Sequence, residues 1–181
     1  MEKALKKAFR QSMTKIFFVF LSTIPLQANA DTPYVGIDYM LTNIEFDSEK
    51  AEPDAIGLRV GASNNNMAFE AQYIRGNTDN IYRMGFDFKQ SAALYFVLQS
   101  DLREGFGMDF SIGYAMTEIA VSGPEETYNG SDNYNGFSWV ISMHQQIPFV
   151  EEANIRLAYQ SLYHDSNLDI TNISLGFTYN F

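Results

Sequence analysis

The chain of 181 residues has no cysteine, only five prolines and a single tryptophan. The absence of cysteine excludes disulfides, thiolate catalysis and cysteine-based metal sites. Positive charge is also scarce, because residues 31–181 hold seven Lys or Arg against 21 Asp or Glu, a net charge of −14. Such an acidic surface argues against binding to nucleic acid and against docking on anionic lipid head groups.

The chain also lacks an apolar run long enough for a spanning helix. Its longest apolar stretch, residues 16–26, falls short of the roughly 20 residues that such a helix needs. This stretch lies between a basic segment and the A-x-A motif that ends at Ala30. That order predicts a signal peptide over residues 1–30, cleaved after Ala30, and an uncleaved anchor is the alternative. Met13 is a second candidate start, since residues 13–30 form a complete signal by themselves.

What the chain does have is strict alternation at its C-terminal end. Every second residue there is apolar, namely Phe181, Tyr179, Phe177, Leu175 and Ile173. The residues between them are small or polar, namely Asn180, Thr178, Gly176, Ser174 and Asn172. This period of two predicts a strand with one face toward hydrocarbon and the other toward water. A transmembrane barrel needs such a strand, because its last strand pairs with its first.

The same alternation runs through the preceding sequence. Eight alternating segments are separated by seven mostly polar connections, at residues 47–54, 63–66, 76–80, 101–105, 122–136, 148–153 and 164–168. The segment that begins at Tyr82 has mostly apolar even-numbered positions, including Phe88, which are expected to face outward. Residues 31–181 are therefore predicted to form one domain, an all-β, eight-stranded antiparallel transmembrane β-barrel.

The predicted barrel has an expected direction in the membrane. Barrels of this class have short periplasmic turns and longer outside loops. The tight connections at 63–66 and 101–105 then lie on the periplasmic side, together with 148–153 and both termini. The acidic connection at 47–54 and the long one at 122–136 lie outside.

Four segments carry a resemblance to a known family: PYVGIDYM, IGLRVGAS, SIGYAMTEI and LGFTYNF. In this order they resemble the small OmpA/OmpX-like outer-membrane barrels, the "porin family" of Gram-negative bacteria. The resemblance implies a monomer without a cofactor, surrounded by outer-membrane lipid and lipopolysaccharide. It also implies that Phe177, Tyr179 and Phe181 form a signal read by the barrel assembly machinery. The peptidoglycan-binding domain of full-length OmpA is not expected here, and neither is its cell-wall tethering.

Charged side chains recur at positions predicted to face the barrel interior. They are Arg59, Glu70, Asp109 and Arg156, joined by Asp38 and Asp87. Opposite charges in a dry lumen pair, because an unpaired buried charge costs several kcal/mol. The favoured interpretation is a packed ionic core, because eight strands leave little free bore. The alternative is the gate of a narrow channel.

One further segment, His164-Asp165-Ser166-Asn167, is similar to a motif of the lipid A deacylase PagL. That resemblance implies His164 as base and Ser166 as nucleophile. Such catalysis needs a third group to orient the base, and Asp169 is the only acidic residue after Ser166. A non-enzymatic protein of envelope integrity that presents surface loops is therefore predicted, with a small-solute channel and a deacylase as alternatives.

Two kinds of side chain have a more ordinary expected role. His144 is expected to be a hydrogen-bonded lumen residue rather than a metal ligand. Six aromatic residues are expected to form the belts at the membrane interfaces, namely Tyr34, Tyr73, Tyr82, Tyr163, Tyr179 and Trp139.

Overall fold

The computed structural model describes residues 32–46, 49–81, 84–100, 104–122 and 130–181. The signal peptide over residues 1–30, its cleavage after Ala30 and the alternative start at Met13 lie outside these residues and stay predictions. So does the expected position of Tyr82.

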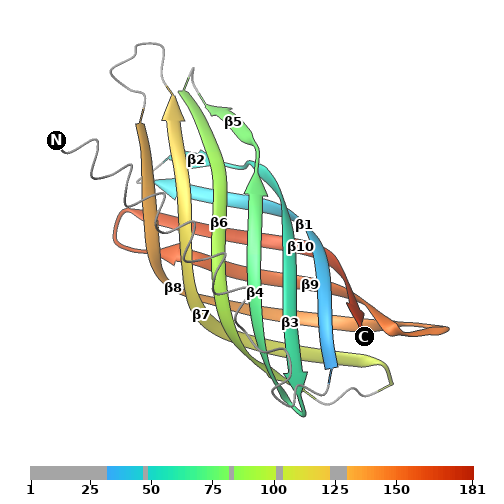
Figure 1. Cartoon of the computed structure of the whole chain (residues 1–181). Helices are drawn as coiled ribbons and strands as arrows, with labels where there is room; N and C mark the ends of the chain where they lie inside the picture. Colours follow the sequence, from blue (N-terminus) through green and yellow to red (C-terminus); the bar gives the residue numbers. More distant parts are fainter. Residues whose placement is uncertain (1–31, 47–48, 82–83, 101–103, 123–129) are drawn as a thin grey trace. The chain divides into compact units, whose positions relative to one another are not determined.

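The described residues form ten strands. They are β1 (Thr32–Phe46), β2 (Glu49–Ala51), β3 (Asp54–Asn64), β4 (Met67–Gly76), β5 (Thr78–Ile81), β6 (Met84–Gln99), β7 (Phe106–Ser122), β8 (Gly130–Ile147), β9 (Val150–His164) and β10 (Leu168–Asn180). The eight long strands pair antiparallel in chain order (Figure 1). β10 pairs with β1 from Tyr34↔Asn180 to Phe46↔Leu168, which closes the sheet. The predicted eight-stranded antiparallel barrel is confirmed.

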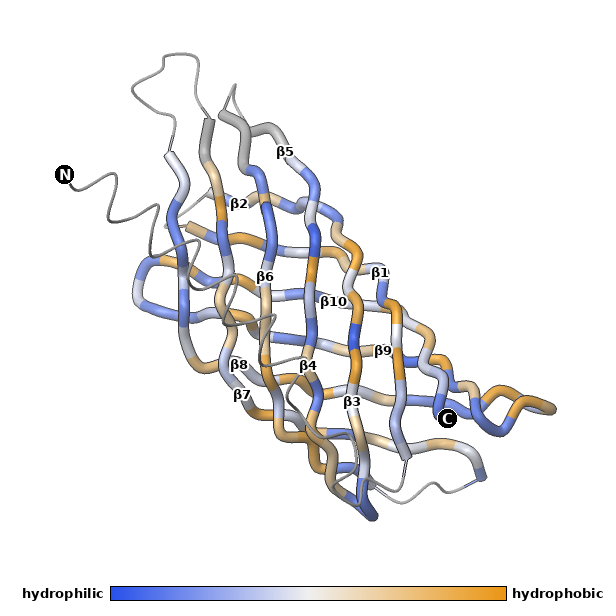
Figure 2. The backbone as a smooth tube through the Cα atoms, in the orientation of Figure 1, coloured by the Kyte–Doolittle hydropathy of each residue, from blue (hydrophilic) through white to orange (hydrophobic). Residues whose placement is uncertain are grey.

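Alternation along each strand separates the two faces of the barrel. Ile37, Leu41 and Ile173 point outward and are more than half exposed, whereas their neighbours Asp38, Thr42 and Asn172 point inward and are almost fully buried. The same alternation appears as changing colour along the strands in Figure 2. In the described part of the chain, no helix has the length and apolar character needed to cross a membrane.

Several strands extend into residues that were expected to be connections. Residues 78–81 form β5 on the edge of β6, and residues 49–51 form β2 on the edge of β1. β8 already begins at Gly130 and β9 at Val150, so the expected connections 122–136 and 148–153 are too long. Side-chain polarity misses these extensions, because strands in water pair through the backbone without needing an apolar face. β6, β7 and β8, at 16–18 residues, exceed the roughly 9–11 residues that cross a bilayer.

A β-bulge at Lys89 reverses the two faces within β6. Phe88 pairs with Ile119 and Gln90 with Glu118, so Lys89 has no partner in this ladder. Phe88 therefore points into the barrel and is fully buried, and the expectation that it faces outward is wrong. Asp87 is correspondingly about one-third exposed and pairs with Lys89 at 3.2 Å. The expectation that Asp87 joins the lumen cluster is wrong for the same reason.

Candidate functional site: a filled barrel lumen

Three charged side chains from neighbouring strands meet inside the barrel. Arg59 of β3 donates through Nε to Asp38 of β1 at 2.6 Å and through Nη1 to Glu70 of β4 at 3.0 Å. Two glycines on adjacent strands leave the necessary room. A Cβ on Gly36 would lie 2.6 Å from Arg59 Nη2, and a Cβ on Gly176 would collide with the Asp38 carboxylate.

Further partners complete this charged layer. Arg156 lies 3.7 Å from Asp38, so the layer contains two guanidinium groups and two carboxylates and is neutral overall. The Tyr34 hydroxyl donates to Glu70 at 3.0 Å, and Arg59 donates to Thr178 at 2.9 Å. Tyr34 is 6% exposed. It is thus a lumen residue, and its expected place in the outer aromatic belt is wrong. A buried set of charges that pair with one another and sum to zero costs much less than an unpaired buried charge.

Asp109, which was expected in the same cluster, lies with other partners. Its carboxylate is 3.2 Å from His144 Nδ1, and the Ser142 hydroxyl donates to it at 3.4 Å. His144 is on the inner face, paired in register with Arg156. The structure therefore brings Arg59, Glu70 and Arg156 together around Asp38 and places Asp109 beside His144.

A second, uncharged layer crosses the lumen next to the charged one. Gln160 of β9 donates to Gln72 of β4 at 2.6 Å and to the Tyr95 hydroxyl of β6 at 2.7 Å. Asn172 of β10 donates back to Gln160 at 3.1 Å. The Tyr95 hydroxyl also lies 2.7 Å from the Ser138 hydroxyl of β8. The bond between Gln160 and Gln72 joins strands on opposite sides of the barrel. Sequence periodicity shows only that these residues face inward, so it gives no sign of the network.

A third layer is apolar. Its largest side chains are at most 1% exposed and belong to the buried core: Ile74 of β4, Phe88 of β6, Leu162 of β9 and Ile170 of β10. Along the strands, the uncharged layer lies between the charged layer and this apolar layer. Phe88 reaches this layer through the bulge in β6. Leu162 sits at a register shift between β9 and β10, where Ser161 pairs with Thr171 and Tyr163 with Ile170. Periodicity does not indicate this apolar layer, because both irregularities change which residues face inward. The sequence therefore predicts an ionic plug alone.

One open space lies on the other side of the charged layer. It is a vestibule of about 310 Å³ whose walls include Asn65 in the β3–β4 turn. Its lining also includes the inward side chains of Tyr34, Arg59, Glu70 and Arg156. The vestibule therefore runs from the end of the barrel with the short turns to the charged layer.

The segment His164-Asp165-Ser166-Asn167 forms the turn between β9 and β10. The Asp165 carboxylate accepts from the backbone N–H groups of Asn167 at 2.7 Å and Leu168 at 3.0 Å, and from the Tyr163 hydroxyl at 2.8 Å. These hydrogen bonds, led by the one from Asn167, hold the pKa of Asp165 below its ordinary value. His164 Nδ1 lies 3.5 Å from Asp169. Ser166 is exposed in the turn, so the segment has the organisation of an Asp-capped turn.

The described residues offer no evident metal centre, since none of them form a group of three or more His, Asp or Glu suited to a metal ion. Of the remaining expected belt residues, Tyr73 and Tyr179 are exposed. Tyr163 is partly buried and packs against Tyr134, with ring centroids 5.6 Å apart.

Residues 16–181 match the family described as outer membrane protein beta-barrel domain. The chain belongs to this family. Membership agrees with the closed antiparallel sheet and its apolar outer face, and it gives the chain an outer-membrane location. The expected resemblance to small outer-membrane barrels is thereby confirmed. None of the curated proteins compared with the chain matches it.

Solved structures of similar barrels share the fold of this family member at low sequence identity. Ail of Yersinia pestis has a TM-score of 0.63 at 13% identity, over 83% of this chain and 98% of Ail. The neisserial surface protein NspA has a TM-score of 0.63 at 12% identity, over 82% and 97%. The N-terminal β-barrel domain of Pseudomonas aeruginosa OprF gives 0.56 at 13% identity, over 82% and 97%.

Proposed function

We propose that the protein is a closed, non-catalytic outer-membrane barrel that contributes to envelope integrity and presents one end at the cell surface. The observation that carries this proposal is the apolar layer of Ile74, Phe88, Leu162 and Ile170. An ion crossing such a layer would lose its hydration without gaining polar partners. The charged and uncharged layers beside it fill the lumen further.

The proposed orientation places the strand extensions outside and both chain termini in the periplasm. The turn at Asn65 and Asn66 is tight, as periplasmic turns of such barrels are. At the opposite end, β6, β7 and β8 continue beyond bilayer length, with β5 alongside β6 (Figure 1). We refer to this end as the loop end. It would present the surface that contacts other cells or molecules.

Conductance in planar bilayers tests the closed lumen. The wild-type barrel should give no steady current, and its shift in gel mobility on boiling would show that the inserted protein is folded. A steady ohmic current from folded protein would refute the proposal and favour a narrow channel, to which the 310 Å³ vestibule would be the entrance. Phe88→Ser combined with Leu162→Ser should raise conductance by admitting water to the apolar layer. Leu157→Ser, on the outer face, is the matched control.

The absence of catalysis is part of the same proposal. Lipid A from cells expressing the wild type and from cells expressing Ser166→Ala should show the same acylation by mass spectrometry. Loss of an acyl chain that depends on Ser166 would support the deacylase alternative instead.

We also propose that the protein acts as a monomer, in contact with lipopolysaccharide, and that the barrel assembly machinery reads Phe177, Tyr179 and Phe181. In support, Phe181 is exposed and packs edge-on against Tyr179, with ring centroids 5.2 Å apart.

A further inference from the structure

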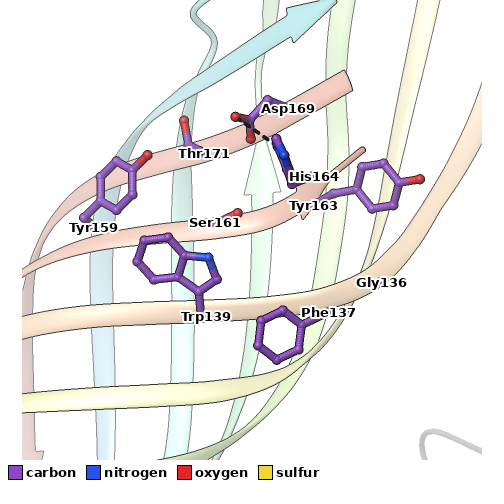
Figure 3. A pocket seen from close by; sticks show the side chains of 9 residues that line it. All are labelled: Gly136, Phe137, Trp139, Tyr159, Ser161, Tyr163, His164, Asp169 and Thr171. Atoms are coloured by element: carbon purple, nitrogen blue, oxygen red, sulfur yellow. Dashed lines mark ion pairs between the residues drawn. The ribbon is translucent and has the colours of Figure 1, made fainter. Parts of the chain in front are cut away.

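An aromatic crevice lies on the barrel wall near the loop end, where β8 and β9 separate. Their last pair in this direction is Trp139↔Ser161, beyond which β8 continues with β7 as its neighbour. The separation leaves a space of about 420 Å³. Figure 3 shows Trp139 and Tyr159 on one side of this crevice and the ion pair of His164 with Asp169 on the other.

The crevice lies at the border of the apolar outer surface. Directly below it on β8, β9 and β10, the outward residues are Ile141, Leu157 and Ile173, all exposed. Toward the loop end, the outward side chains that follow Leu157 on β9 and Ile173 on β10 become polar. Ser161 and Thr171 pair across these strands, and Asp169 follows. An amphiphilic molecule could thus place its polar head in the crevice and its hydrocarbon chains on the apolar surface below.

The lining has the groups that recognise a sugar ring. Trp139 and Tyr159 both line the crevice, with ring centroids 5.6 Å apart, and aromatic rings of this kind pack against the C–H side of a pyranose. Asp169 can accept from sugar hydroxyls, while the Ser161 and Thr171 hydroxyls can donate or accept. A few placed polar groups beside aromatic walls are typical of small-ligand sites.

The charge of the crevice selects among possible head groups. Its lining contains no Lys or Arg, and its one basic side chain, His164, already faces Asp169 at 3.5 Å. Asp169 is also paired in register with Glu45 of β1, so two carboxylates are neighbours on the outer face. A phosphate would meet repulsion here, whereas an uncharged sugar would not.

We propose that this crevice binds the uncharged hexose head group of a membrane glycolipid in the leaflet at the loop end, with its acyl chains along the outer faces of β8, β9 and β10. This site is independent of whether the lumen conducts. It also does not depend on which end of the barrel faces outside.

The crevice contains its own spectroscopic probe, because Trp139 is the only tryptophan of the sequence. The full chain, folded into phosphatidylcholine nanodiscs, is titrated with monoglucosyl diacylglycerol while Trp139 emission is recorded. We expect a saturable change with the glycolipid and no such change with diacylglycerol lacking the sugar. Asp169→Asn replaces a charged acceptor by a neutral one and should weaken half-saturation about five- to tenfold, the usual difference between a hydrogen bond to a charged group and one to a neutral group. Asp87→Asn, a carboxylate on the outer face of another strand, should leave it unchanged.

Three results would overturn the proposal. They are an equal response to the lipid without sugar, tighter binding of phosphatidylglycerol than of the glycolipid, and equal weakening by Asp87→Asn and Asp169→Asn. Mobility on unboiled gels identifies variants that fail to fold. If Asp169→Asn is one of them, Thr171→Val replaces it, and a half-saturation equal to wild type would then count against the site. The wild-type comparison of lipids with and without sugar needs no variant.

Discussion

Replacing Arg59 with methionine should destabilise the barrel strongly, because this side chain is only 2% exposed and balances two buried carboxylates. The substitution keeps most of the apolar stem and removes the guanidinium that contacts Asp38 and Glu70. Both carboxylates are at most 5% exposed, so the layer is left with a buried net charge of −1. Removing one partner of a buried ion pair costs about 3–5 kcal/mol, and we expect a loss of that size in the free energy of unfolding.

A second substitution separates the charge imbalance from the lost contacts. Arg59→Met combined with Glu70→Gln restores neutrality, because Arg156 still faces Asp38 at 3.7 Å. The new amide can still accept the hydrogen bond from Tyr34. We therefore expect the double variant to be about 1–2 kcal/mol more stable than Arg59→Met alone, a coupling usual for residues in direct contact.

Urea unfolding in lipid vesicles, followed by the emission of Trp139, measures the free energy of unfolding of the single and the double variant. Lys89→Met serves as a control because its ion pair with Asp87 is exposed, and such pairs contribute about 1 kcal/mol or less. The reasoning fails if Arg59→Met unfolds within about 1 kcal/mol of wild type. It also fails if the double variant is no more stable than the single one.

Three further predictions address other parts of the chain. Gly113→Ala should destabilise the barrel by about 1–3 kcal/mol, because its Cβ would collide with the backbone carbonyl of Leu94. Gly130→Ala is the control, since this position has open space around it, and it should unfold like wild type in the same urea titration. Deleting Phe181 should lower the amount of folded protein in the outer membrane, measured by unboiled gels, while changing the free energy of unfolding of purified protein little; normal membrane levels would contradict the assembly signal. Since the folded pKa of Asp165 is lowered, the order of its turn should be kept above the ordinary Asp pKa and lost as pH falls through the lower folded value. The protection of the Asn167 amide relative to its intrinsic exchange rate should fall over the same range in the wild type but not in Asp165→Asn, and wild-type protection that stays constant with pH would refute this.

The fold was predictable from the sequence because a membrane barrel repeats one simple constraint. Alternation such as that of Ile37, Asp38 and Tyr39 identifies both a strand and its outer face. The meeting of Arg59, Glu70 and Asp38 was likewise within reach, since all three lie at inward positions of neighbouring strands.

The expectations that the structure corrects have separate physical causes. Asp87 and Phe88 lie on the faces opposite to those that alternation predicts, because the bulge at Lys89 shifts the alternation of β6. Aromatic residues near strand ends usually lie in the outer belt, which predicts that place for Tyr34, whereas its hydroxyl donates to Glu70 inside the barrel. The crevice between β8 and β9 arises from strand divergence, for which periodicity gives no signal.

The bulge at Lys89 exchanges the inward and outward positions of β6. On one side of it Ser91, Ala93 and Tyr95 point inward, and on the other side Phe88 does, so odd and even positions exchange roles. Because Phe88 and Gln90 pair with the consecutive residues Ile119 and Glu118, deleting Lys89 alone would give a regular strand with Phe88 still inward and Asp87 still outward. A single deletion at a regularly paired position of β6 would instead exchange the inward and outward side chains on one side of it, so we expect the loss of one residue to be tolerated at Lys89 and not at its paired neighbours.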